Sequence, residues 1–313
     1  MAWRFEPGEG LGAAFRRVAT EEIAKVRAGL ADPAKDRAKA IHEARQGFKR
    51  LRALLRLAEP SLGRAFSDEN RLWRDAGRQL SGPRDRTVLL ESFDKVVSGC
   101  RGGLPERDLE RLRSHIAANG ADPRAFDVDA HVLIVLGLLD DADQRVAGLE
   151  WPADPRALAK GLKRSQSRLR RNWKTARKAT EPAALHDWRK RVKDQSAQLR
   201  LFRGVAPPGL RSRHSVEKRA AELLGEEHDF WLLEERLSVG SCPADAVAAR
   251  DVLLGEIGGR RRTLRNEAFK LGKDFSSQKP KAFARELTFA WEKTSARAGD
   301  KRRGEIDAIS QGS

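Results

Sequence analysis

A long internal repeat constrains the fold of this chain more than any other sequence feature. The segment HEARQGFK begins at His42, and HDWRKRVK begins at His186, 144 residues later. In both, an arginine follows the histidine by three residues and a lysine follows it by seven. The same offset aligns the segments that come next, through LSGPRD and LGEEHD. Two amphipathic helices that are alike by chance would not keep this register, so we predict two homologous halves that meet near Trp151.

The spacing of apolar residues is typical of helices along the whole chain. Periodic stretches are separated by Pro and Gly, no run of alternating β-branched or aromatic residues predicts a strand, and the chain has no tyrosine. We therefore predict an all-α protein with about six helices in each half, over 1–150 and 151–297, followed by a disordered tail over 298–313. The predicted helices cover roughly 9–30, 34–57, 61–80, 84–99, 105–118, 127–148, 155–179, 182–204, 207–225, 228–238, 244–271 and 279–297.

The chain carries a large excess of positive charge. Its 62 Lys and Arg residues against 45 Asp and Glu residues give a net charge of +17. Such an excess repels itself and indicates a polyanionic partner, which can be nucleic acid, an anionic membrane or a phosphate polymer.

The sequence features that report on cellular location favour the cytoplasm. Cys100 and Cys242 cannot form a disulfide framework, and neither belongs to a CxxC pair. The start of the chain lacks the pattern of a signal peptide. The longest apolar run, 132–139, is too short to span a bilayer. We expect a cytoplasmic protein with no membrane partner.

Positive side chains form a stripe on each of the two repeated helices. An ordinary solvated helix face contains both positive and negative side chains. Each of these stripes instead has no acidic residue and lies next to the apolar residues that face the core. The same pattern also recurs in the other half of the chain. Like charges three and four residues apart oppose helix formation, so a role in anion binding is expected for them. The stripe of the first half consists of His42, Arg45, Lys49, Arg52 and Arg56, and the corresponding positions of the second half are His186, Arg189, Lys193, Ser196 and Arg200.

A third basic segment precedes His186. From Arg156 to Lys178 there are ten basic residues and no acid. This segment predicts that the ligand is negatively charged but does not identify it, because a nucleic-acid-binding helix has the same pattern. In the segments after the stripes, Asp85 and Asp229 are expected to cap helices. The additional candidate contacts are Lys160, Lys163, Arg164, Arg168 and Arg171, the repeat pair Arg74 and Lys218, and the repeat pair Arg84 and His228.

These residues give the chain a resemblance to the CHAD family, helical domains named for their histidines. The resemblance is carried by HEARQGFKRLR, HDWRKRVKD, the trailing RD and HD pairs and the basic helix before His186, and it extends from Phe5 to Trp291. It implies two pseudo-symmetric helical-bundle repeats with a basic central groove or pore, which bind inorganic polyphosphate without catalysis and can gather on polyphosphate granules. Some relatives have a further N-terminal triphosphate-processing domain, which we do not expect here.

Carried over position by position, the resemblance predicts two sets of contacts. Gln195 and Ser196 stand where the first half has Leu51 and Arg52, so we expect weaker binding by the second half. The implied contacts are His42, Arg45, Lys49 and Arg52, together with His186, Arg189 and Lys193.

Two other functions are alternatives. A basic helical protein that binds nucleic acid has the same charge pattern, although the tryptophans lie at core-like spacings rather than as a platform for stacking bases. A phosphate-transferring enzyme with His42 or His186 as nucleophile is disfavoured, because the sequence has no Arg-His-Gly phosphatase signature, no GxxxxGK[ST] loop and no carboxylate cluster for magnesium. We therefore predict a binding protein without catalytic activity, metal or cofactor, whose partner is polyphosphate rather than nucleic acid.

Overall fold

The computed structural model describes residues 3–100, 103–118, 127–179, 181–205, 208–239 and 244–310, and their side chains except at 82–86, 208, 244 and 299–310. Within these ranges all regular secondary structure is helical, which confirms the prediction of an all-α protein. The helices are α1 Leu11–Ala31, α2 Arg37–Leu62, α3 Arg64–Gln79, α4 Gly82–Val97, α5 Glu106–Ala118, α6 Val128–Asp140, α7 Ala142–Ala147, α8 Pro155–Lys178, α9 Pro182–Leu201, α10 Pro208–Ser238, α11 Val247–Ser277 and α12 Pro280–Ser310, with short 3₁₀ turns at Phe202–Gly204 and Ala244–Ala246.

Helix α10 corrects the prediction of two helices over 207–225 and 228–238. It is one continuous helix of 31 residues, so Asp229 lies in its interior and is not a cap. The equivalent segment of the first half is interrupted between α3 and α4, next to Pro83. Pro83 lacks the N–H that would continue the hydrogen bonds of α3, whereas Gly225 costs only about 1 kcal/mol and is tolerated.

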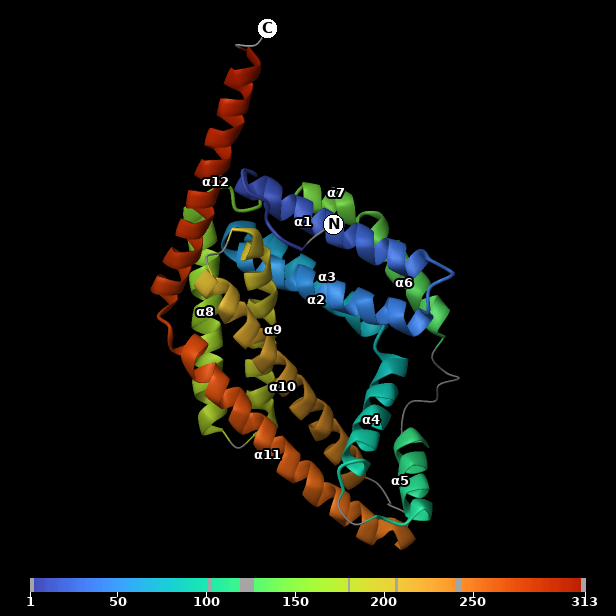
Figure 1. Cartoon of the computed structure of the whole chain (residues 1–313). Coiled ribbons are helices and arrows are strands. Elements are labelled where there is room, and N and C mark those ends of the chain that lie inside the picture. The colour runs from blue at the N-terminus through green and yellow to red at the C-terminus, as the bar shows by residue number, and fades with distance from the viewer. Residues whose placement is uncertain are drawn as a thin grey trace.

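Other helix boundaries also differ from the prediction: α2 continues past residue 57 to Leu62, and α11 continues past residue 271 to Ser277. The stretch 127–148 is divided at Asp141 into α6 and α7. Helix α12 continues through residue 310, where a disordered tail was predicted from residue 298, and its end projects beyond the rest of the molecule (Figure 1).

The largest apolar core joins helices of the N-terminal half to the ends of later helices. It includes Phe48 of α2 and Trp73 of α3, whose rings stack with centroids 5.6 Å apart. Leu158 of α8, Leu199 of α9 and Trp291 of α12 belong to the same core. Helices α1, α2 and α3 lie side by side with α6 and α7 at one end of the molecule (Figure 1).

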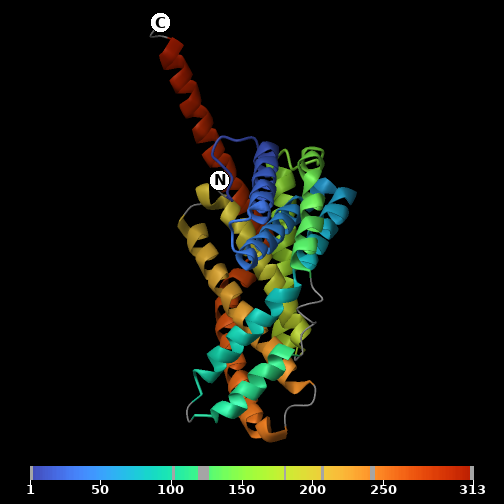
Figure 2. The ribbon, with the colours of Figure 1, turned by 90° about the vertical axis from the view of Figure 1, so that its right-hand side faces the viewer.

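A second core lies at the other end and crosses the predicted boundary at residue 150. Phe93 of α4 and Leu112 of α5 pack there with Phe230 of α10 and with Leu253 and Ile257 of α11. Figures 1 and 2 both show α4 and α5 beside the lower parts of α10 and α11, far from α1. The first 150 residues therefore do not form a spatially separate unit.

The crossing of α2 and α8 depends on a glycine. A Cβ atom at Gly161 would collide with the backbone carbonyl of Leu57, so only glycine lets the two helices approach so closely. This approach brings the basic side chains of α8 to the end of the first repeated helix, where the candidate site lies.

None of the helices, over the part of the chain that the structure describes, has the length and apolar character needed to cross a membrane.

Candidate anion-binding site

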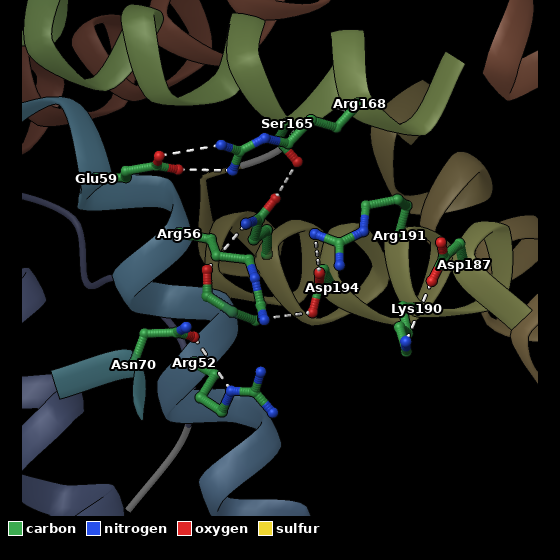
Figure 3. Close-up of polar contacts among 12 residues, drawn as sticks. Arg52, Arg56, Glu59, Asn70, Ser165, Arg168, Asp187, Lys190, Arg191 and Asp194 are labelled. Carbon is green, nitrogen blue, oxygen red and sulfur yellow. Dashed lines mark hydrogen bonds and ion pairs between the residues drawn. The ribbon is translucent and has the colours of Figure 1, made fainter. Parts of the chain in front are cut away.

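The two repeated helices meet at a cluster that we call the arginine junction, formed by Arg52, Arg56, Arg191 and Asp194 (Figure 3). Arg56 Nη1 of α2 donates to Asp194 Oδ1 of α9 at 2.9 Å. Arg191 Nη1 lies 3.1 Å from the other carboxylate oxygen, Oδ2. Arg52 Nε donates to Asn70 Oδ1 of α3 at 3.1 Å. One carboxylate thus holds arginines from both repeated helices.

Positive charge is crowded at the arginine junction. The pKa of Arg52 is lowered to about 10, first by burial and then by the positive charges of Arg56, Arg74 and Arg191, while Asp194 opposes these effects. Burial also lowers the pKa of Arg56, with Arg191 acting in the same direction. These arginines stay charged at neutral pH. The lowered pKa values therefore record first the cost of burying charge, and in addition the repulsion between neighbouring arginines. An added anion would relieve this repulsion.

Acids from other helices pair with several predicted contact residues. Glu59 of α2 accepts two hydrogen bonds from Arg168 of α8, at 2.6 and 3.0 Å (Figure 3). Glu59 also lies 3.3 Å from Arg164. The sequence of one helix does not reveal such partners, because they belong to a different helix. The stripes lack acids of their own, as the sequence indicates, but the folded protein compensates part of their charge.

Two more predicted residues pair within their own helices and lie apart from the arginine pairs. Arg74 donates to the neighbouring Asp75 at 2.8 and 3.1 Å. Lys218 lies 3.7 Å from Glu222. Both pairs are exposed or half-exposed, so they contribute little to stability.

A second site, which we call the histidine pocket, lies where α9 packs against α10. The rings of His186 and His228 have centroids 4.6 Å apart, and His228 stacks on Trp231 at 5.4 Å. Arg189 and Glu227 line the same small pocket. His186 Nδ1 and Arg189 Nε are buried and make no hydrogen bond, so the pocket holds polar atoms that a ligand oxygen could satisfy.

Arginines of α11 hold the acid of the histidine pocket. Glu227 Oε1 accepts hydrogen bonds from Arg261 Nε and Nη2 at 3.1 and 3.0 Å, and from Arg265 Nε at 2.7 Å. Arg261 also pairs with Glu234. The negative charge of Glu227 is therefore compensated by arginines of α11. This compensation reduces the repulsion that Glu227 would exert on an anion in the histidine pocket.

The two histidines of the pocket are held neutral. Burial lowers the pKa of His228 to about 3, and Arg189, His186, Lys193 and Lys190 act in the same direction. Burial and the nearby Lys190 also lower the pKa of His186. At neutral pH each imidazole therefore carries one N–H donor and one acceptor nitrogen.

The lowered pKa of His228 predicts that acid destabilises the fold. Between its ordinary value of 6.5 and about 3, the unfolded chain binds a proton at this residue and the folded chain does not. The contribution is complete above pH 6.5 and is lost as the pH falls, by up to about 1.4 kcal/mol per pH unit. Replacing His228 with Gln should flatten the fall of the melting temperature between pH 6.5 and pH 4. An unchanged slope would show that His228 is protonated in the folded protein.

The remaining predicted residues are distributed along α2, α8 and α9. His42 Nδ1 is buried without a hydrogen-bond partner, like its repeat equivalent His186 Nδ1. Arg45 Nη1 donates to the carbonyl of Gly77 at 3.0 Å. Lys49 is exposed and Lys193 is half-buried. The side chain of Arg84 lies outside those that the structure describes. Exposed positions on α8 are occupied by Lys160, Lys163, Arg164 and Arg171.

Sequence reasoning missed Arg191 and Asp194, which form the centre of the arginine junction. At the offset of 144, Arg191 aligns with Gly47, which is buried against α1, so the repeat gives no signal for it. A signal was available in the spacing of Arg191 and Asp194, because an acid and a base three residues apart on one helix face commonly interact.

No group of three or more His, Cys, Asp or Glu side chains suited to a metal ion occurs among the residues described. Cys100 is a free thiol whose sulfur lies 3.4 Å from the carbonyl of Val96, and Cys242 lies outside the described residues.

Comparison with known families decides the identity of this fold. Residues 11–238 match the CHAD domain. The chain belongs to the CHAD family. The CHAD match covers α1 to α10 and therefore both repeated helices, the arginine junction and the histidine pocket, whereas α11 and α12 follow it. No curated protein matches the chain. CHAD domains are generally non-catalytic binding domains.

Proposed function

We propose that this CHAD protein binds inorganic polyphosphate without catalysis, through the cations of α2 and α9. The observation that carries the proposal is the arginine junction, where arginines of both repeated helices crowd around one carboxylate. Buried imidazole Nδ1 atoms without a hydrogen-bond partner, at His42 and His186, add possible hydrogen bonds to phosphate oxygens.

Polyphosphate suits this arrangement of charge. It is a flexible chain with about one negative charge per unit and no bases, so successive phosphates can contact successive Arg and Lys side chains. By analogy with nucleic acids, the affinity would come largely from released counterions and would fall steeply with salt.

The tryptophans favour a base-free polyanion over nucleic acid. Six of the seven are buried in the apolar cores, and Trp231 is covered on one face by His228. Proteins that bind single-stranded nucleic acids usually expose aromatic rings on which bases stack. Nucleic acid is therefore the second candidate.

We further propose that the two halves are pseudo-symmetric and form one basic groove. The equivalent histidines, His42 and His186, lie in the second turn of α2 and α9, and both have a buried Nδ1 without a partner. In the same register, the interrupted pair α3 and α4 corresponds to the continuous α10. The groove would follow the cations of α2 to the arginine junction and continue along α9 to the histidine pocket.

A titration with two matched polyanions tests the proposed function. Purified protein is titrated with long-chain polyphosphate and with single-stranded RNA of equal total charge at the same salt concentration. We expect tighter binding of polyphosphate and no release of orthophosphate. RNA binding of equal or greater strength would contradict the proposal, and orthophosphate release that His42→Ala abolishes would indicate an enzyme. A fluorescent fusion should gather on cytoplasmic granules only in cells that synthesise polyphosphate.

A further inference from the structure

The arginine junction contains an acidic residue, which is unexpected in a site that binds an anion. Asp194 is bound to Arg56 and lies beside Arg191, at the centre of the proposed groove (Figure 3). We propose that Asp194 determines chain-length specificity, by occupying the place of one phosphate so that only long polyphosphate binds well. This inference rests on the proposed function.

The geometry of Asp194 resembles that of a bound phosphate. Its two carboxylate oxygens face two different arginines, one from each repeated helix, at 2.9 and 3.1 Å. The side chains of Arg56 and Asp194 are only 13% and 15% exposed, so their attraction is less screened by water than that of a surface pair. A phosphate that enters the arginine junction must therefore displace Asp194.

The carboxylate is held firmly on one side only. Oδ1 accepts the hydrogen bond from Arg56, whereas Oδ2 is buried and accepts no well-aligned hydrogen bond, although Arg191 lies close enough for an ion pair. Because Arg52 adds further positive charge, one carboxylate does not balance the charges of Arg52, Arg56 and Arg191. A polyanion with several charges could replace Asp194 and compensate them more completely.

Displacement of Asp194 affects short and long chains differently. A short phosphate oligomer has few other contacts, so the loss of the Arg56–Asp194 pair offsets most of its gain. A long chain can also contact the exposed cations of α2, α8 and α9, and each further contact forms at the high effective concentration of a tethered ligand. The long chain can even bind these cations while Asp194 stays in place.

The test compares tripolyphosphate with long-chain polyphosphate on Asp194→Asn. Asparagine keeps the size of the side chain and removes its charge. We expect the affinity for tripolyphosphate to rise at least about tenfold, equal to about 1.4 kcal/mol, and the affinity for the long chain to rise less, so the preference for the long chain falls. An unchanged preference, or a loss of affinity for both ligands, would overturn the inference and leave Asp194 as a residue that only holds α9 against α2.

Asp187→Asn is the matched control. Asp187 is on the same helix and pairs with Lys190 at 3.1 Å, but it is 61% exposed and lies outside the arginine junction. Its replacement changes the net charge equally and should raise both affinities by the same small factor. A fall in preference as large as that of Asp194→Asn would show that net charge alone is responsible, and would contradict the inference.

A second pair of variants covers the case in which Asp194→Asn folds poorly. Arg191→Gln is compared with Arg191→Gln/Asp194→Asn, which keeps the net charge of the wild type. The double variant should bind tripolyphosphate more tightly than Arg191→Gln does, and equal binding would overturn the inference. Failure of the wild type to bind long-chain polyphosphate would instead refute the proposed function, so the two failures are distinguishable.

Discussion

Replacing Phe48 with Ala should lower the free energy of unfolding by about 3–5 kcal/mol. Phe48 is 1% exposed and stacks on Trp73 in the largest core, so its removal loses apolar burial and leaves a cavity between α2 and α3. The same two helices are linked by the hydrogen bond from Arg45 to the carbonyl of Gly77, and this bond cannot fill the cavity. Chemical denaturation followed by circular dichroism measures the effect.

Phe289→Ala is the matched control for this prediction. Phe289 is 61% exposed on α12, so its replacement should change the free energy of unfolding by less than about 0.5 kcal/mol. A loss below about 1 kcal/mol for Phe48→Ala would contradict the packing of α2 against α3 described above.

The triple variant Arg45→Ala/Lys49→Ala/Arg189→Ala should bind long-chain polyphosphate at least about tenfold more weakly than the wild type. It removes cations from both repeated helices, and one of them lines the histidine pocket. If three phosphate contacts are lost, the slope of log affinity against log salt concentration should also become shallower by about 2. Titrations at several salt concentrations measure both quantities.

A control triple variant separates site contacts from net charge. Lys281→Ala/Arg285→Ala/Lys293→Ala removes the same charge from exposed positions of α12, away from the repeated helices. Its affinity should stay within about threefold of the wild type at physiological salt, where charges farther apart than about 8 Å are screened. Equal losses of affinity in both variants, or undiminished binding by a folded Arg45/Lys49/Arg189 variant, would show that the binding site lies elsewhere.

The helices could be predicted from sequence where a breaking residue separates them. The break between α3 and α4 lies next to Gly82-Pro83 in both the prediction and the structure, because proline lacks the N–H that would continue the hydrogen bonds of α3. The glycine of the equivalent segment, Gly225, gives only a weak signal, and tertiary packing of α10 against α9 and α11 makes that helix continuous. The packing of α4 and α5 on α10 and α11 leaves no local pattern in the sequence.

The candidate site was predictable in its charge but not in its pairing. The repeat identifies His42, His186 and Arg189, and the structure brings His186 and Arg189 together with His228 in one pocket. Nothing local to α2 shows that Arg56 pairs with Asp194, because these residues are 138 positions apart. Cross-helix partners of this kind decide which cations are exposed to a ligand and which also hold the fold together.

Lysine footprinting tests most directly whether one polyphosphate chain contacts both repeated helices. The protein is acylated with and without saturating long-chain polyphosphate, and the modified lysines are quantified by mass spectrometry. We predict strong protection of Lys49 on α2 and Lys193 on α9, with unchanged labelling of Lys281 and Lys293 on α12. Protection of only one of the two repeated helices, or equal protection at all four lysines, would contradict a single site formed by both halves.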